Sequence, residues 1–470
     1  MPARILKVLL LVALALMIGS LRSSVAPSPP ENLEIGEPAP TDDVGEIHAI
    51  EASPTGEVWA VGETLSKPTK GFVARWDGTE WKNEATLSIA GGDHSLHDIA
   101  IVSQTDMWVV GQYSAGPKTA KPLIAHWDGA DWKVVTGIDT GPGNSGLRTI
   151  TAVAPDDIWV GGWYNQEGRS PEARSIILHW DGKAWGSFPP PANAKRYIDD
   201  MSAVSTDDVW AVAGNSIIHW DGTSWSEAYT IGDRSKPWSA PNFMGVEALS
   251  EQDVWVVGYS LMVASCDYGS AHILHWDGHT WASVPYPPVG GYCAGPPGLV
   301  DIHALASNDI WAVGTALYRP MAMHWDGKTW SLTTCPDVGL SGGEGFGGLA
   351  GVTGAKGKIW IAGSRTIRRE ESSTSNGPAF LTQPFIMHPY RGVCPTPTPL
   401  PTPVPQPPTF VPPTMPEVPG PVRTDLPRPV QTAVAPDAVA TTISVNRTAT
   451  AFVSTQTRSV PPPGPTPPVP

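Results

Sequence analysis

Short apolar runs separated by polar turns recur along the chain from about residue 44 to residue 394, and they predict β-strands. In the unit between residues 302 and 330, three such runs cover 302–305, 310–314 and 321–325. The dipeptide Asp326-Gly327 then predicts a two-residue type I′ hairpin, and a fourth strand begins at Trp330. A turn of this length would place Trp325 opposite Lys328 and Met323 opposite Trp330. The alternation of strand side chains would then put both tryptophans on one face, one diagonal apart.

Tryptophan recurs with the same period as the apolar runs, and 19 of the 21 tryptophans follow it. One occurs seven times, at Trp59, Trp108, Trp159, Trp210, Trp255, Trp311 and Trp360, and at every position except Trp210 it begins the motif Trp-apolar-apolar-Gly, with small residues counted as apolar. Two more flank an Asp-Gly turn in six units, at 76/81, 127/132, 180/185, 220/225, 276/281 and 325/330. A fixed period of this size is typical of repeat architectures. We therefore predict an all-β fold, a seven-bladed β-propeller of four-stranded antiparallel blades.

The seventh unit is degenerate, because Ile386-Met387-His388-Pro389-Tyr390 replaces the usual run before the Asp-Gly turn. Residues 31–46 could supply its outer strand and close the ring. The repeated motif resembles tectonin-type propeller repeats, and its Asp-Gly-x-x-Trp hairpin resembles a shortened Asp-box. The resemblance covers residues 47–388 and implies a propeller fold. Proteins with such repeats include carbohydrate binders, sialidases, lectins and assembly factors, so the resemblance does not choose a function.

Composition divides the chain into four parts. Residues 1–26 have the basic start and short apolar core of a secretory signal, with an uncleaved anchor as the alternative. Residues 27–43 form a linker, 44–394 the propeller, and 395–470 a Pro/Thr-rich segment expected to be disordered. We expect a secreted or cell-surface monomer that contacts a membrane only through an uncleaved N-terminal segment. The formal charge of −15 argues against nucleic acid as a partner.

The four cysteines are Cys266, Cys293, Cys335 and Cys394, and in an exported chain disulfides are the default. Cys266 and Cys293 both fall in loops of the fifth unit that emerge on one face, so we expect them to pair. By elimination Cys335 would pair with Cys394. Their expected positions at different ends of their strands leave that pairing open.

Function is expected on the face that carries the loops between strands two and three and between blades, because these loops differ in every unit. Aromatic and arginine side chains in those loops could stack on a sugar or anchor a peptide. The candidate ligand-binding residues are Trp163, Tyr164, Tyr113, Tyr197, Trp238, Tyr259, Arg148, Arg196 and Arg319. Each could instead simply cover the end of a blade.

Carboxylates near the start of the innermost strands could ring the mouth of the central channel, and a hard cation such as Ca²⁺ is the only cofactor they suggest. The candidates are Glu46, Asp98, Asp200 and Asp301. The recurring histidines before the Asp-Gly turns lie too far apart for a metal, and we expect them to bond to neighbouring blades. The recurring aspartates before the first tryptophans are expected to satisfy backbone donors in turns.

Catalysis has little support, because the chain has no Gly-x-x-x-x-Gly-Lys-Ser/Thr phosphate-binding loop. The preferred hypothesis is a non-catalytic exported propeller that binds a glycan, a peptide or a surface protein on the long-loop face. One alternative is a secreted glycan-active hydrolase or lyase that uses channel-mouth carboxylates. Another is a purely structural cell-surface or assembly protein.

Overall fold

The computed structural model describes residues 32–38, 44–77, 81–87, 92–116, 119–138, 140, 143–165, 174–192, 194, 196–231, 241–260, 270–288, 298–316, 319–333, 345–368 and 380–390. The expected signal sequence, the Pro/Thr-rich segment, the four cysteines and Trp238 lie outside these residues. Within them, no helix has the length and apolar character needed to cross a membrane.

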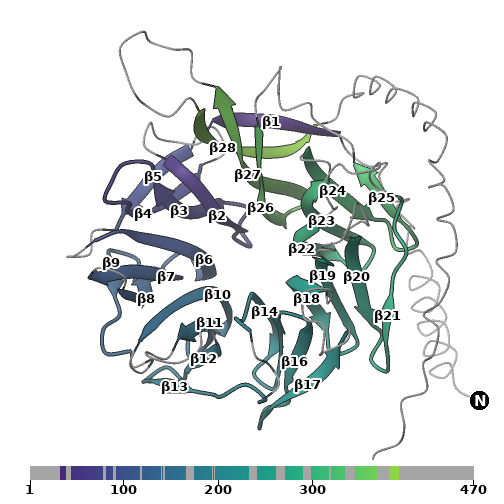
Figure 1. Cartoon of the computed structure of the whole chain (residues 1–470), viewed down its shortest axis with the longest axis horizontal. Coiled ribbons are helices and arrows are strands. Elements are labelled where there is room, and N and C mark those ends of the chain that lie inside the picture. Colours follow the sequence, from purple (N-terminus) through teal and green to yellow (C-terminus); the bar gives the residue numbers. More distant parts are fainter. Residues whose placement is uncertain are drawn as a thin grey trace, which may run out of the picture. The chain divides into compact units, whose positions relative to one another are not determined.

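Six consecutive blades each contain four antiparallel strands in chain order (Figure 1). The strands of blades 1 to 3 are β2 (Val44–Ala52), β3 (Val58–Thr64), β4 (Gly71–Trp76), β5 (Trp81–Thr86); β6 (His94–Ser103), β7 (Asp106–Gly116), β8 (Thr119–Trp127), β9 (Trp132–Val134); β10 (Asn144–Ala154), β11 (Asp157–Asn165), β12 (Arg174–Trp180), β13 (Trp185–Ser187). Those of blades 4 to 6 are β14 (Asp200–Ser205), β15 (Asp208–Ala213), β16 (Ser216–Trp220), β17 (Trp225–Thr230); β18 (Asn242–Ser250), β19 (Asp253–Ser260), β20 (Ser270–Trp276), β21 (Trp281–Ser283); β22 (Gly298–Ala306), β23 (Asp309–Ala316), β24 (Arg319–Trp325), β25 (Trp330–Thr333).

A closing sheet joins the two ends of the repeat region. It contains β26 (Gly345–Ala355), β27 (Lys358–Arg368), β28 (Phe380–Tyr390) and, as its outer strand, β1 (Asn32–Pro38). β1 runs antiparallel to β28, with Asn32 opposite Tyr390, and β26 packs between β22 and β2. The prediction of an all-β propeller with four-stranded antiparallel blades is confirmed, and so is the N-terminal origin of this outer strand.

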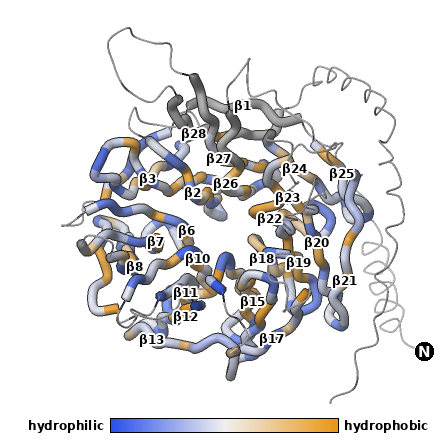
Figure 2. Tube along the Cα trace, viewed as in Figure 1, coloured by the Kyte–Doolittle hydropathy of each residue, from blue (hydrophilic) through white to orange (hydrophobic). Residues whose placement is uncertain are grey.

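The core lies between adjacent sheets and follows from the period-2 pattern of the strands. Val58, Val61, Val109 and Val160 in the second strands are fully buried. Figure 2 shows hydrophobic positions along the strands and hydrophilic ones at many of the turns between them. Each apolar cluster combines residues of two neighbouring sheets, so every blade is stabilised by its neighbours.

The predicted two-residue hairpin is wrong. Trp325 pairs directly with Trp330, and the other five tryptophan pairs follow the same register. The turn takes four residues because the side chain of its aspartate accepts the backbone N–H groups of the third and fourth residues, as Asp326 does from Lys328 and Thr329. The glycine has positive φ, +88° at Gly327. The two indole rings therefore face each other, with centroids 5.7–6.0 Å apart across the six pairs.

The recurring histidines bond within their own blades, which corrects the expected contacts with neighbouring blades. In blade 2, His126 Nε2 lies 2.7 Å from Asp106 Oδ1, and its ring stacks on Trp108. The same carboxylate accepts the indole N–H of Trp108, so the recurring aspartate serves these side chains instead of turn donors. Blades 3 to 6 repeat the histidine–aspartate contact at 2.7–2.8 Å. In blade 1 an Arg75–Glu57 ion pair at 3.1 Å takes its place.

Candidate binding site at the channel mouth

The glycine of the Trp-apolar-apolar-Gly motif allows the innermost strand to bulge. In β3 this residue is Gly62, and a Cβ there would overlap the carbonyl oxygen of Glu46 on β2. Gly111, Gly162, Gly258 and Gly314 have the same close contact with the innermost strands of their own blades. At this level the register of each innermost strand shifts by one residue, which is a β-bulge. A bulge turns the extra residue away from the ladder, toward the channel.

The bulge residues form one ring at the mouth of the central channel. In five blades and the closing sheet, each ring residue is the one at which the register of the innermost strand shifts. Blade 4 shows no shift at this level, and its equivalent residue directly precedes β14. The seven residues are His48, His97, Arg148, Asp199, Met244, Val300 and Ala350. All seven line a mouth cavity of about 500 Å³, together with Trp163 and Gln112. The four ionisable members come from blades 1 to 4 and the three apolar members from the other sheets, so the mouth is polar on one side only.

Arg148 is the cation of this ring, and two neighbours fix its position. Its Nε lies 3.5 Å from Oδ1 of Asp199, whose side chain is only 4% exposed. The guanidinium lies over the ring of Tyr197, 5.4 Å from the centroid. Burial raises the pKa of Asp199 to about 6, although Arg148 counteracts this. Arg148 keeps 38% of its side chain exposed, so it remains accessible to a ligand.

Two histidines of the ring lie beside Arg148, and their pKa values are shifted in opposite directions. His48 and His97 have ring centroids 5.3 Å apart, and each ring bonds through Nδ1 to a carbonyl of the next blade, at Leu96 and Leu147. Burial and the adjacent His48 lower the pKa of His97 to about 4. Burial also acts on His48, but the Glu46 carboxylate outweighs it and raises the pKa of His48. At neutral pH, His97 is therefore a neutral hydrogen-bonding group.

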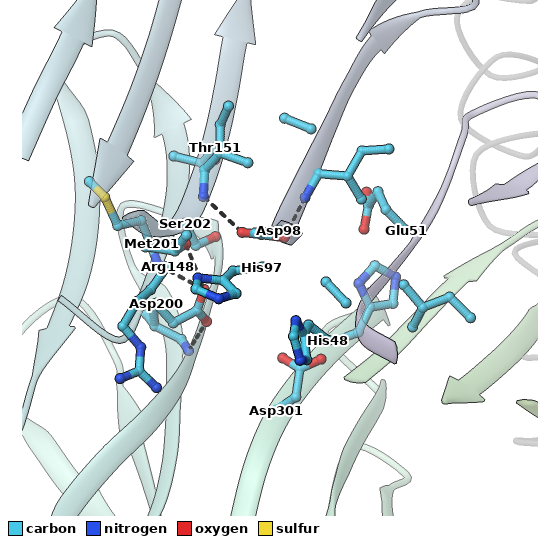
Figure 3. A pocket seen from close by; sticks show the side chains of 18 of the residues that line it. His48, Glu51, His97, Asp98, Arg148, Thr151, Asp200, Met201, Ser202 and Asp301 are labelled. Carbon is cyan, nitrogen blue, oxygen red and sulfur yellow. Dashed lines mark hydrogen bonds between the residues drawn. The ribbon is translucent and has the colours of Figure 1, made fainter. Parts of the chain in front are cut away.

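Below the mouth, the channel cavity of about 340 Å³ is lined by the innermost strands of all seven sheets (Figure 3). Three of the predicted channel aspartates, on alternate blades, each join their own strand to the next blade. Asp98 accepts the N–H groups of Ile99 and Ile150 at 2.8 and 2.7 Å. Asp200 does the same with Met201 and Val246, and Asp301 with Ile302 and Val352. These carboxylates are thus part of the structure that holds blades together.

Glu46 does not belong to that set. Its side chain is 54% exposed at the mouth, and Ala49 occupies the position in blade 1 that corresponds to Asp98, because each of these two residues directly follows the bulge of its strand. Among the described residues, no three His, Cys, Asp or Glu side chains are close enough together to hold a metal ion. The four predicted carboxylates therefore do not converge on an ion site.

Two further channel carboxylates, Glu51 and Glu247, were not identified from the sequence. Each pairs across the ladder with the first tryptophan of its blade, Trp59 and Trp255. Glu247 accepts the N–H of Ala304 at 3.4 Å, and Glu51 accepts the hydroxyl of Thr353 at 3.3 Å. Thr353 in turn accepts the N–H of Ala52 at 2.9 Å, which links the closing sheet to blade 1.

Burial and mutual repulsion make the channel carboxyls weak acids. Burial raises the pKa of Glu51 to about 7, and burial together with Asp200 raises that of Asp301 to about 8. Burial also raises the pKa of Asp200 to about 6, and it raises the pKa values of Asp98 and Glu247 well above their usual range. At neutral pH the channel therefore holds both protons and negative charge.

The predicted aromatic candidates separate into different environments. Trp163 lines the mouth, whereas Tyr164, the next residue of β11, packs against the apolar core between blades 2 and 3. Tyr113 packs against the core between blades 1 and 2 and also lines a second hollow. Tyr259 covers Gly298. Tyr197 is 38% exposed under Arg148.

The other two arginine candidates lie away from the mouth cavity or cannot be placed. Arg196 donates to Asn242 Oδ1 at 2.9 Å and does not line the mouth. The backbone of Arg319 begins β24, but its side chain lies outside what the structure describes. The structure thus brings together Arg148, Trp163 and Tyr197 from the predicted set.

No protein-family model matches the chain, and no curated protein matches its sequence. Among solved structures, YCF48 bound to a D1 peptide is 14% identical, covering 78% of this chain and 99% of its own, with a TM-score of 0.47. A catalytically inactive virginiamycin B lyase from Staphylococcus aureus with quinupristin is 14% identical, covering 76% and 99%, with a TM-score of 0.49. The SapL1 lectin with α-methyl fucoside is 14% identical, covering 64% and 97%, with a TM-score of 0.39. Values this low carry no argument about ligand or chemistry, and the tectonin-like resemblance stays a prediction.

Proposed function

We propose that this protein is an exported, non-catalytic seven-bladed propeller, with the closing sheet as its seventh blade, that binds its ligand at the channel mouth. The observation that carries the proposal is the ring of seven residues at the mouth, because equivalent backbone positions of the seven sheets place six different kinds of side chain there. A scaffold that repeats its backbone and varies only the projected residue is suited to recognition.

The chemistry of the ring supports binding. Arg148 is held from both sides by Asp199 and Tyr197, which keeps a hydrogen-bonding cation in one position before any ligand arrives. Trp163 adds an aromatic surface in the same cavity, and its volume of about 500 Å³ is in the range of small-ligand sites. The Asp98, Asp200 and Asp301 carboxylates are engaged by backbone donors of two blades, so they serve the scaffold.

Binding can be tested with arrays of glycans and of peptides, followed by calorimetry on any ligand found. Arg148→Ala and Trp163→Ala should each weaken binding at least about tenfold, which corresponds to 1.4 kcal/mol. Arg196→Ala is the matched control, because Arg196 belongs to the same end of the propeller but not to the mouth. If all three variants bind as tightly as the unaltered protein, the mouth is not the site.

A glycan-active hydrolase or lyase is the second candidate, favoured by one observation. Asp200 and Asp301 share the channel and have pKa values of about 6 and about 8, and glycoside cleavage needs one carboxyl charged and one protonated. Incubation with polysaccharides distinguishes the two functions. Release of reducing ends that disappears in Asp200→Asn and Asp301→Asn would support the enzyme, whereas binding without product supports the first proposal.

A further inference from the structure

A second hollow of about 330 Å³ lies beside the channel mouth, over blade 2. It is lined by Glu63, Lys67, Thr69, Asp93, His94, Ser95, Gln112, Tyr113, Ser114, Thr119, Ala120 and Asn144. Nothing in the mouth ring requires this hollow, and the sequence pointed to only one of its residues, Tyr113.

The hollow and the mouth cavity are adjacent, as three relations between their lining residues show. Gln112 lines both cavities. Ser95 lines the hollow, and its hydroxyl lies 3.0 Å from Nε2 of His97 in the mouth ring. Glu63 of the hollow pairs across the β2–β3 ladder with Glu46 of the mouth. The linings of the two cavities together form a polar track from the channel axis outward across blade 2.

An unused acceptor lies at the junction. Gln112 Oε1 is buried and has no hydrogen-bond partner among the described residues. It approaches Gly146 so closely that a Cβ there would lie 2.6 Å from this oxygen and 3.0 Å from Nε1 of Trp163. Because Gly146 has no side chain, the Gln112 amide and the Trp163 indole both fit at this point. A buried acceptor without a donor is unfavourable, so a turn of the Gln112 amide that brings its oxygen to a ligand hydroxyl would be favourable.

The side chains of the hollow suit a chain of hydroxyl groups. They are hydroxyls, amides, carboxylates, one ammonium and the imidazole of His94 around the ring of Tyr113, and Ala120 is the largest aliphatic side chain among the described lining residues. Two polar members are already fixed, since Asp93 accepts the N–H of Thr69 at 2.7 Å and Asn144 that of Ala120 at 3.0 Å. An extended peptide would instead need a free strand edge or apolar pockets. β7 offers no edge here, because it is paired with both β6 and β8.

From this geometry we infer that the ligand is an oligosaccharide that extends from the channel mouth across blade 2, with its middle at Gln112. The inference rests on the proposed function and specifies its ligand. Trp163 and Arg148 hold one end of the saccharide in the mouth. Tyr113, Asn144 and Asp93 contact the other end in the hollow.

The test compares chain lengths. The full-length protein is titrated by calorimetry with glucose, mannose, galactose and N-acetylglucosamine and with the linear hexasaccharides built from each, in parallel with a library of extended peptides. We expect at least one hexasaccharide to bind ten or more times as tightly as its own monosaccharide. Equal affinities for the two lengths, or binding of peptides alone, would overturn the inference while leaving the mouth as the binding site.

Two variants locate the second half of the track. Gln112→Ala should remove most of the gain from chain length, and Gly146→Ala should do the same by displacing the Gln112 amide. The matched controls are Thr315→Ala and Gly298→Ala in blade 6, at the positions equivalent to Gln112 of blade 2 and Gly146 of blade 3, and a Cβ on Gly298 would meet only ordinary contacts at 3.4 Å. Thermal melting confirms that all four fold. Retention of the full gain in both Gln112→Ala and Gly146→Ala contradicts the proposed track, even if Arg148→Ala and Trp163→Ala lose binding and so support the mouth as the binding site.

Discussion

The two ends of each blade follow different rules. At the Asp-Gly end, five of the described turns share one hydrogen-bond pattern, six tryptophan pairs share one register, and the histidine–aspartate contact recurs in five blades. At the mouth end, the backbone bulge recurs but the projected residue changes from histidine to arginine, aspartate, methionine, valine and alanine. Repetition thus accompanies packing, and variation accompanies the surface available to a ligand.

The largest expected difference in stability is between substitutions of two tryptophans on the same strand, β11. Trp159 is 1% exposed and packs against Trp220 at 5.1 Å, so Trp159→Ala should lower the free energy of unfolding by about 3–5 kcal/mol. Trp163→Ala, four residues further on, should cost about 1 kcal/mol or less and act mainly on binding. Urea unfolding measures both changes. Equal losses would show that the mouth end is as much a part of the core as the other end.

A second contrast concerns aspartates. Asp200→Ala leaves the N–H groups of Val246 and Met201 without their acceptor and should cost about 2 kcal/mol, with faster hydrogen exchange at Val246. Asp221→Ala removes an acceptor from the exposed turn of the same blade, where water can replace it, and should lower stability clearly less than Asp200→Ala does. The comparison fails if the exposed turn proves the more sensitive.

The channel carboxyls and the aspartates of the Asp-Gly turns should make the stability of the fold depend on pH in opposite directions. Burial raises the folded pKa of Glu51 to about 7 and of Asp301 to about 8, so the folded state binds protons more tightly than the unfolded chain. Stability should therefore increase as pH falls from about 8 to 5, with a melting temperature higher by about 2–5 °C. Glu51→Gln should reduce this slope in calorimetric scans.

Below pH 4 the aspartates of the Asp-Gly turns determine how stability changes with pH. The side chain of Thr223 and the backbone N–H groups of the turn lower the pKa of Asp221 to about 2, so its contribution is lost as pH falls toward that value. Maximum stability is thus expected near pH 5. A melting temperature that falls steadily from pH 8 to pH 5 would contradict the role given to the channel carboxyls.

The smallest expected change in stability tests whether the Arg75–Glu57 pair of blade 1 is equivalent to the histidine–aspartate contact of the other blades. Arg75→Ala breaks the ion pair with Glu57, which is about 28% exposed, and should cost about 0.5 kcal/mol. The double change Arg75→His with Glu57→Asp restores the pair found in the other blades and should recover most of that loss. A double variant less stable than Arg75→Ala would show that blade 1 has its own packing.

The repeated part of the molecule could be predicted from the sequence because periodicity and turn residues are local signals. The register of the Asp-Gly hairpin could not, since the side chain of Asp326 lengthens the turn by bonding to residues that a two-residue turn would place in strands. Of the mouth ring, only Arg148 was among the predicted ligand-binding residues, because a bulge moves a residue out of the alternation. A signal for the bulge was present, however: Gly162 follows Trp159 in the motif that allows a bulge, and Arg148 stands eleven residues before that tryptophan.

The hydrogen bond from Ala52 to Thr353 and the pairing of Asn32 with Tyr390 have a consequence for folding. The first described strand is complete only when the last one is present, so a nascent chain carries β1 unpaired throughout synthesis. Contacts across more than 300 residues make folding slow. Early blades must therefore persist with one open side until β28 has been synthesised, and any factor that shields that side during folding would increase the yield of folded protein.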